Sequence, residues 1–176
     1  MKTLKTILAL GILFISFGAM AQNDDDKRIM ADAENAKTTM MAADASLGDF
    51  FNNSAGYVIF PNVGKGGFII GAAAGNGVLY ENGTAQGMAK LKKLSVGLQA
   101  GGQAISEIIF FENEAALNSF KDGDFEFAAG ISAVVLKTGK AETAQYKEGV
   151  AVFALPKAGL MAEASVGGQK FSYDSF

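Results

Sequence analysis

Apolar residues near the N-terminus follow the spacing of a single helical stripe. They recur at alternating intervals of four and three positions, at Ile29, Ala33, Ala36, Met40, Ala43 and Leu47. Residues three and four positions apart share one face of an α-helix, so this spacing predicts an amphipathic helix over residues 24–47. Three aspartates at residues 24–26 suit the helix N-terminus, and Gly48 suits its end. We expect the apolar stripe to pack on the protein core.

The polar face of this helix argues against a helix that lies on a membrane surface. It carries Asp32, Glu34 and Asp44 against Lys37. Membrane-surface helices usually carry lysine and arginine on that face. We therefore favour packing on the core over membrane contact for this helix.

From Ala55 onward the apolar pattern changes to the two-residue period of β-strands. One face of residues 94–101 carries Leu94, Val96, Leu98 and Ala100, and the other carries Ser95, Gly97, Gln99 and Gly101. Asn82-Gly83 between two such runs predicts a tight hairpin turn. Residues 112–122 are a run of good helix formers and predict one short inserted helix. The β-rich part is expected to extend over residues 55–173.

These elements predict one α+β domain over residues 22–176. An N-terminal amphipathic helix would pack on a strongly curved antiparallel sheet or barrel, with one short helix inserted between the strands. Successive short strands separated by turn signals favour this architecture over βαβ units. The chain is long enough to bury a sizeable core.

The first 21 residues have the pattern of a cleavable secretory signal peptide. Lys2 and Lys5 precede an apolar run over residues 7–17, and Ala19-Met20-Ala21 matches a small-residue cleavage site. The apolar run is too short to span a bilayer comfortably. We therefore expect residues 1–21 to be removed and the mature chain to be periplasmic or secreted, with an uncleaved anchor helix as the alternative.

The composition excludes several kinds of chemistry. The chain contains no cysteine and no histidine, which rules out disulfides, a lipid-anchor cysteine, Cys and His metal sites and Ser-His catalysis. Removing Lys2 and Lys5 from 15 basic residues leaves 13 against 18 acidic ones, so the mature net charge is −5. This charge gives no electrostatic footprint for nucleic acid, and attraction to an anionic surface must come from a local patch. We expect neither a cofactor nor a nucleic-acid partner.

A lysine between glycines, Gly64-Lys65-Gly66, resembles a fragment of a phosphate-binding loop. A Walker A loop needs a glycine five residues before its Gly-Lys and a hydroxyl residue after the lysine, but Ile59 and Gly66 occupy these positions. The glycines that follow also miss the dinucleotide-binding spacing. We therefore expect strand corners or close backbone approach here rather than a nucleotide site.

Carboxylates are the remaining candidates for acid–base chemistry. They are Glu112, Glu114, Asp122, Asp124 and Glu163. The first four lie beside predicted turns or the inserted helix, where solvation explains them, and Glu163 has an outward-facing phase in its strand. Nothing favours a hydrolytic pair, so we expect no catalytic residues and no enzyme activity.

The one local basic cluster consists of Lys90, Lys92 and Lys93. In an extended chain Lys90 and Lys92 point to one side, and Leu91 and Lys93 point to the other. Three positive charges beside apolar residues, Met88, Leu91 and Leu94, suit a lipid headgroup surface, into which the apolar side chains would dip. They suit equally well an edge strand that lysines protect against pairing with another chain.

A faint internal repeat adds two further lysines to the candidate lipid-binding residues. Lys65 and Lys157 each begin a Lys-x-Gly-apolar pattern, and each is followed ten residues later by a glycine. Two β-units with similar corners would produce this repeat, and so would coincidence in a chain rich in glycine and alanine.

The order and spacing of several short motifs resemble the SYLF domain family. The motifs are Phe60-Pro61, Lys65-Gly66-Gly67-Phe68, Gly75-Asn76-Gly77, Gly97-Leu98-Gln99-Ala100-Gly101, the strand and helix over residues 109–120, and Ala158-Gly159-Leu160 followed by Gly167. The resemblance covers about residues 30–173. It implies a lipid-binding module with no known enzyme activity. Eukaryotic members of that family bind phosphoinositide membranes and, in fungi, actin, whereas bacterial members are exported.

Two features differ from the family pattern. The chain has no tryptophan, which often stands near the middle of the domain, and its first helix starts with aspartates rather than basic residues. We therefore expect neither phosphoinositide specificity nor actin binding. The resulting hypothesis is a non-catalytic protein of the bacterial envelope or secretome that binds lipids or an anionic membrane surface. The alternative is an envelope scaffold that forms a homo-oligomer and has no specific lipid ligand.

Overall fold

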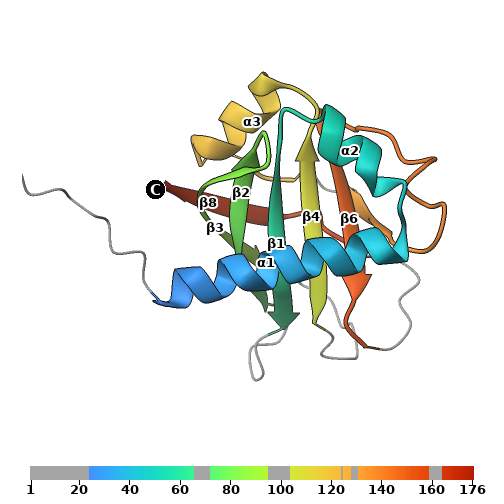
Figure 1. Ribbon diagram of the computed structural model, residues 1–176. Helices are drawn as coiled ribbons and strands as arrows, with labels where there is room; N and C mark the ends of the chain where they lie inside the picture. The colour runs from blue at the N-terminus through green and yellow to red at the C-terminus, as the bar shows by residue number, and fades with distance from the viewer. Residues whose placement is uncertain (1–23, 66–71, 95–103, 124, 128–130, 159–163) are drawn as a thin grey trace, which may run out of the picture.

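The computed structural model describes residues 24–65, 72–94, 104–123, 125–127, 131–158 and 164–176. Its helices are α1 (Asp24–Ala43), α2 (Leu47–Asn53) and α3 (Glu114–Lys121). Its strands are β1 (Gly56–Lys65), β2 (Ala72–Glu81), β3 (Thr84–Leu94), β4 (Ile105–Phe111), β5 (Ser132–Val135), β6 (Val150–Pro156), β7 (Ala164–Ser165) and β8 (Gln169–Ser175). The predicted α+β class is confirmed (Figure 1).

The strands form one sheet in the order β7-β5-β6-β4-β1-β2-β3-β8. Neighbouring strands are antiparallel except β5 and β6, which run parallel. Among the described residues the sheet ends at β7 and β8 and stays open, so the barrel alternative is wrong. The short length of β5 and β7 leaves few ladder positions for closure. A single isolated bridge, Glu126 opposite Lys170, joins the chain before β5 to β8.

The sheet turns between its centre and its β8 edge. In Figure 1, β1, β4 and β6 run nearly vertically, whereas β8 runs nearly horizontally and passes behind β1. The register of β1 shifts between Ile59 and Gly64 on the β2 side, and between Phe60 and Val63 on the β4 side. Such irregularities bend a strand and increase its twist, so they are the local means by which the sheet curves.

The first predicted helix is present but divided. α1 crosses one face of the sheet over β1, β4 and β6 (Figure 1), and it buries Ala33, Ala36 and Met40 as its apolar stripe predicted. The single helix expected over residues 24–47 instead ends at Ala43, and α2 starts at Leu47. The break falls at Asp44, whose carboxylate accepts hydrogen bonds from the backbone amides of Ser46 and Ala141.

Two local predictions are confirmed by the backbone. The turn after β2 places Asn82 at φ 49° and Gly83 at φ 75°, the positive angles that an Asn-Gly hairpin turn requires. The inserted helix is α3, and the side chain of Asn113 caps it by accepting a hydrogen bond from Ala116 N at 3.0 Å. Short-range sequence signals therefore determined both features.

The sheet separates two hydrophobic cores. The outer core lies between the sheet and the first two helices, and includes Ala33, Met40, Leu47, Tyr57, Ile59, Val78, Tyr80, Ile108, Phe110 and Phe153. The inner core lies on the other face, under α3, and includes Val58, Phe60, Leu79, Leu91, Ile109, Phe111, Phe120, Phe127 and Phe171. Alternate residues of β1 and β4 enter opposite cores, so both strands are buried on both faces.

Candidate functional site

Two of the predicted lysines lie on one exposed face of β3. Lys90 and Lys92 are exposed, whereas Leu91 between them and Ala89 beside Lys90 are buried in the inner core. This is the alternation that the sequence predicted for an extended chain. The structure therefore brings Lys90 and Lys92 together on the side of the sheet opposite the inner core.

The neighbouring strand adds a third lysine to this face. Lys170 of β8 stands directly opposite Lys92 in the antiparallel ladder, and Lys90 lies opposite Ser172. Directly opposite residues have Cβ atoms about 5 Å apart, so the side chains of Lys92 and Lys170 leave the sheet close to each other. We call Lys90, Lys92 and Lys170 the β3–β8 basic strip.

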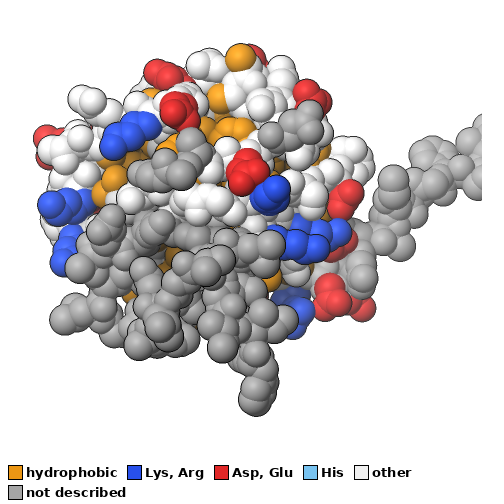
Figure 2. Space-filling view, turned by 180° about the vertical axis from the view of Figure 1, so that it is seen from behind, with side chains coloured by type: hydrophobic (Ala, Val, Ile, Leu, Met, Phe, Trp, Pro, Cys, Tyr) orange, Lys and Arg blue, Asp and Glu red, His pale blue; other side chains and the backbone are white. Residues whose placement is uncertain are grey.

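Carboxylates accompany two of the three lysines in the strip. Lys90 Nζ lies 3.1 Å from Asp174 Oδ2, and Lys170 Nζ lies 3.3 Å from Glu126 Oε2. Lys92 makes no ion pair within the described part of the chain. Figure 2, which views the molecule from behind, shows lysine and arginine side chains interspersed with acidic ones rather than a uniform basic field.

Leu91, one of the apolar side chains expected to enter a membrane beside these lysines, does not lie on the face that carries the strip. Leu91 is only 1% exposed and points into the inner core. Met88 is partly buried and packs against the outer core. The side chain of Leu94 lies outside the described residues. What the described face offers is charge, because the pleat that exposes Lys90 and Lys92 turns Leu91 inward.

The edge-strand explanation of these lysines is wrong. β3 pairs with β2 on one side and with β8 on the other, so it is an interior strand. The edge on this side of the sheet is β8, which contributes Lys170. A single strand does not reveal its neighbours, which is why the pattern around Lys90 allowed either interpretation.

The remaining predicted lysines do not join the strip. Lys65 and Lys93 occupy one cross-strand row, each paired with Ala73 of β2, and their side chains lie outside the described residues. Lys157 follows β6, on the opposite half of the sheet, where its Nζ donates a hydrogen bond to Asn62 Oδ1. The candidate lysines of the cluster and of the internal repeat therefore fall at separate places in the sheet.

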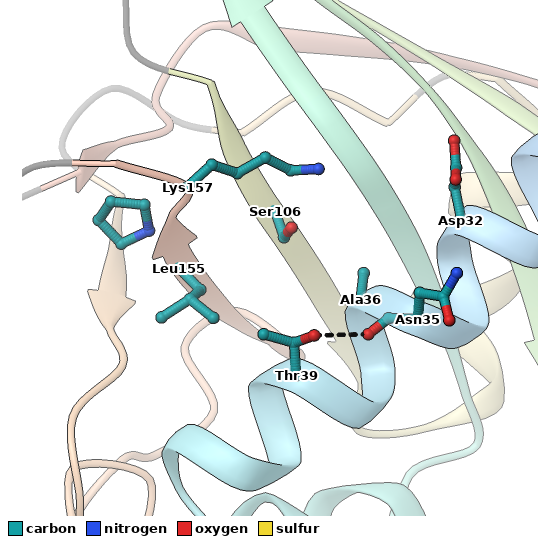
Figure 3. Close-up of a pocket in the computed structure, with 8 residues that line it drawn as sticks. Asp32, Asn35, Ala36, Thr39, Ser106, Leu155 and Lys157 are labelled. Carbon is teal, nitrogen blue, oxygen red and sulfur yellow. Dashed lines mark hydrogen bonds between the residues drawn. The ribbon is translucent and has the colours of Figure 1, made fainter.

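A cleft lies between α1 and the sheet near Lys157. Its larger part, about 320 Å³, is lined by Asp32, Asn35, Ala36, Thr39, Ser106, Leu155, Pro156 and Lys157 (Figure 3). An adjoining part of about 210 Å³ shares Asp32 and is otherwise lined by Arg28, Ile29, Pro61, Asn62 and Asn76. We call the two parts together the α1 cleft. Sequence reasoning missed it because its walls come from segments far apart in the chain.

One buried carboxylate also escaped the sequence analysis. Glu107 of β4 is fully buried, and its Oε2 accepts a hydrogen bond from Gln169 Nε2 at 3.1 Å. An amide donor offsets part of the desolvation of a buried carboxyl group. The pair ties β4 to β8 across the inner side of the sheet, which gives it a structural role.

Comparison with known proteins assigns part of the chain to a family. Residues 92–175 match the family model named Ysc84 and described as Las17-binding protein actin regulator. Residues 92–175 of the chain belong to the SYLF (Ysc84) family. It is also 27% identical over 126 residues to Beta cell expansion factor A of Aeromonas veronii, covering 70% of this chain and 48% of that protein. The chain thus spans about half the length of this SYLF relative.

The SYLF match contains most of the candidate lysines. It begins at Lys92 and includes Lys93, Lys157 and Lys170, whereas Lys65 and Lys90 precede it. It extends from the end of β3 through β8 and therefore contains both partners of the Lys92–Lys170 pair. The helix that supplies Asp32 to the α1 cleft lies before the matched residues.

Among the described residues, the carboxylates considered for catalysis form no buried pair. Glu112, Glu114 and Asp122 are exposed around α3, while Asp124 and Glu163 lie outside the described residues. No cluster of three or more His, Asp or Glu side chains that could hold a metal occurs among the described residues. The SYLF family is not known for enzymatic activity. Within the described chain, no helix combines the length and apolar character needed to cross a bilayer.

Proposed function

We propose that this SYLF protein binds anionic lipid surfaces without catalysis, through the β3–β8 basic strip. The observation that carries this proposal is the position of Lys92 directly opposite Lys170 on an exposed face. Like charges in directly opposite positions destabilise an antiparallel pair. An anionic headgroup between or above the two lysines would remove that repulsion.

The acidic neighbours of the strip limit its attraction without abolishing it. The Lys90–Asp174 and Lys170–Glu126 pairs are solvent-exposed, and exposed ion pairs contribute little to stability. They can therefore open when a phosphate approaches. Each basic residue near an anionic membrane contributes roughly 1 kcal/mol, so the strip supports weak, salt-sensitive binding rather than insertion.

The cellular setting of this proposal follows from the N-terminus. A cleavable signal peptide over residues 1–21 would deliver the protein to the periplasm or the medium, where it meets membrane surfaces. The partner we propose is an anionic membrane surface. A homo-oligomeric scaffold without a lipid ligand is the competing function.

Liposome co-sedimentation at low salt tests the proposed function. Mature protein should bind vesicles that contain phosphatidylglycerol and should ignore vesicles of phosphatidylcholine alone. The double variant Lys92→Glu with Lys170→Glu should weaken binding by about tenfold or more, since two attractive charges become repulsive. Lys137→Glu with Lys140→Glu is the matched control, because both lysines are exposed and lie away from the strip.

Variants that should bind vesicles more strongly distinguish an electrostatic effect from damage to the fold. Asp174→Asn and Glu126→Gln each release a strip lysine from its carboxylate. Each should strengthen vesicle binding severalfold, a result that a misfolded variant is not expected to mimic. Equal binding by the two double variants would contradict the proposal. A stable oligomer in light scattering, together with no vesicle binding, would favour the scaffold.

A further inference from the structure

Besides Arg28, which forms an ion pair with Asp25, the α1 cleft holds two opposite charges that do not neutralise each other in an ion pair. Asp32 is partly buried and makes no ion pair within the described part of the chain. Lys157 is exposed and donates to the neutral side chain of Asn62. Folding has therefore placed an anion and a cation at the same cavity while leaving each available to a third group.

The directions of these side chains favour one shared ligand. Figure 3 shows the Lys157 side chain reaching across the cleft towards the side that carries Asp32, with Ser106 beside the Lys157 side chain. Asn62, the partner of Lys157, lines the part of the cleft that Asp32 also lines. Asp32 and Lys157 therefore line one cavity, and Asp32 lines both parts of the cleft.

Other polar groups that line the cleft add specific recognition. Asn35 and Asn76 present side-chain amides, and the buried Ser106 hydroxyl donates to Pro61 O at 3.0 Å and keeps acceptor capacity. Leu155 and Pro156 supply an apolar wall. A cavity of about 320 Å³ with polar groups and an apolar wall falls within the volume range of small-molecule sites.

We propose that the α1 cleft binds a phosphate ester that carries a primary ammonium group. Lys157 and the Asn62 amide would hold the phosphate, because lysine binds phosphate as a point charge. Asp32 would accept hydrogen bonds from the ammonium group. This chemistry occurs in an ethanolamine phospholipid headgroup and in free phosphoethanolamine compounds. The site is separate from the basic strip and does not depend on the proposed membrane function.

The lining of the cleft favours a primary over a quaternary ammonium. Recognition of quaternary ammonium groups typically uses the faces of aromatic rings. The described residues that line the cleft include no aromatic side chain. A carboxylate and amide oxygens instead suit an ammonium that can donate hydrogen bonds.

Binding of soluble ligands to the mature protein tests the site. We expect sn-glycero-3-phosphoethanolamine to bind more tightly than glycerol 3-phosphate or glycerophosphocholine in calorimetric or NMR titrations. Lys157→Gln should weaken binding of the ethanolamine ester and of glycerol 3-phosphate by about tenfold each. Asp32→Asn should weaken only the ethanolamine ester, and it should strengthen glycerol 3-phosphate binding by removing a like charge.

Matched control variants and one further double variant complete this experiment. Lys140→Gln and Asp122→Asn remove the same charges at exposed positions away from the cleft and should leave binding unchanged. Lys92→Glu with Lys170→Glu should also leave soluble binding unchanged, which separates the cleft from the strip. Failure of the ethanolamine ester to bind, or Asp32→Asn affecting all three ligands equally, would overturn the proposal.

Vesicles then identify the source of the ligand. If phosphatidylethanolamine vesicles retain the protein more than phosphatidylcholine vesicles, and Asp32→Asn removes the difference, the cleft binds a lipid headgroup. If the soluble ester binds and the vesicles do not differ, the cleft binds a free compound. Both results support the site's chemistry.

Discussion

Asp44 shows how one side chain changes the course of the chain. It is 3% exposed, and its carboxylate accepts hydrogen bonds from Ser46 N at 3.1 Å and from Ala141 N at 2.8 Å. Burial raises the pKa of this carboxyl group, but hydrogen bonds from the amides of Ala141, Ser46 and Gly139 outweigh it and lower the pKa below 3.8. The ionised carboxylate thus ends α1 and holds the loop after β5 against it.

The Asp44 pKa predicts a pH-dependent contribution to stability. A lowered folded-state pKa means that the contribution is present above pH 3.8 and is lost as the pH falls through the folded value. Asp44→Asn should therefore lower the free energy of unfolding by about 1–3 kcal/mol at neutral pH, and by less in strong acid. Urea titrations at both pH values measure this, with Asp122→Asn as the exposed control. The same loss at both pH values would contradict the prediction.

Two glycines of paired strands show what glycine contributes to an element. A Cβ atom added to Gly77 of β2 would lie 2.5 Å from Ile59 O and 2.6 Å from Phe60 Cδ1. A Cβ added to Gly64 of β1 would meet nothing within 4 Å. Gly77 therefore permits the close approach of β2 to β1 beside the register shift, whereas Gly64 does not limit packing there.

This difference predicts opposite outcomes for the same substitution. Gly77→Ala should destabilise the protein by about 1–3 kcal/mol, because a backbone oxygen cannot move aside cheaply. Gly64→Ala should be neutral or stabilise by about 0.5 kcal/mol, since alanine restricts the unfolded chain. Thermal or urea unfolding of both variants gives the comparison. Equal stabilities would show that β2 shifts to accommodate the extra methyl group.

The two cores are coupled through strands that serve both of them. In β1, Tyr57 and Ile59 enter the outer core, whereas Val58 and Phe60 enter the inner core. Loss of either layer therefore exposes apolar residues of strands whose alternate residues pack in the other core, and it weakens that core as well. We expect α1 and the sheet to unfold as one cooperative unit.

Met40→Ala tests this coupling from the helix side. Met40 is 0% exposed between α1 and the sheet, so truncation should cost about 2–5 kcal/mol. Met41→Ala, at a partly buried neighbour, should cost less. The urea midpoints from far-ultraviolet circular dichroism and from tyrosine signals of the outer core should fall together. Two separate transitions would indicate that the helix layer detaches from a stable sheet.

Features that depend on neighbouring residues were predictable from the sequence. The stripe of α1, the Asn82-Gly83 turn, the inserted α3 and the common face of Lys90 and Lys92 all follow from periodicity and turn chemistry. These signals act over a few residues, where backbone geometry alone fixes which side chains share a face. The short range of these signals also explains why the end of the first helix was predicted wrongly. The Ala141 amide that helps to end α1 lies 97 residues from Asp44 along the chain.

Tertiary structure alone decided the position of the candidate sites. The sequence pattern did not show that Lys170 stands opposite Lys92, or that β3 is an interior strand. It also did not show that Asp32 and Lys157 line one cleft. A two-residue period assigns a side chain to a face but carries no information about which strand pairs beside it. The sequence determined the elements and their faces, and strand pairing and helix docking determined which charges meet.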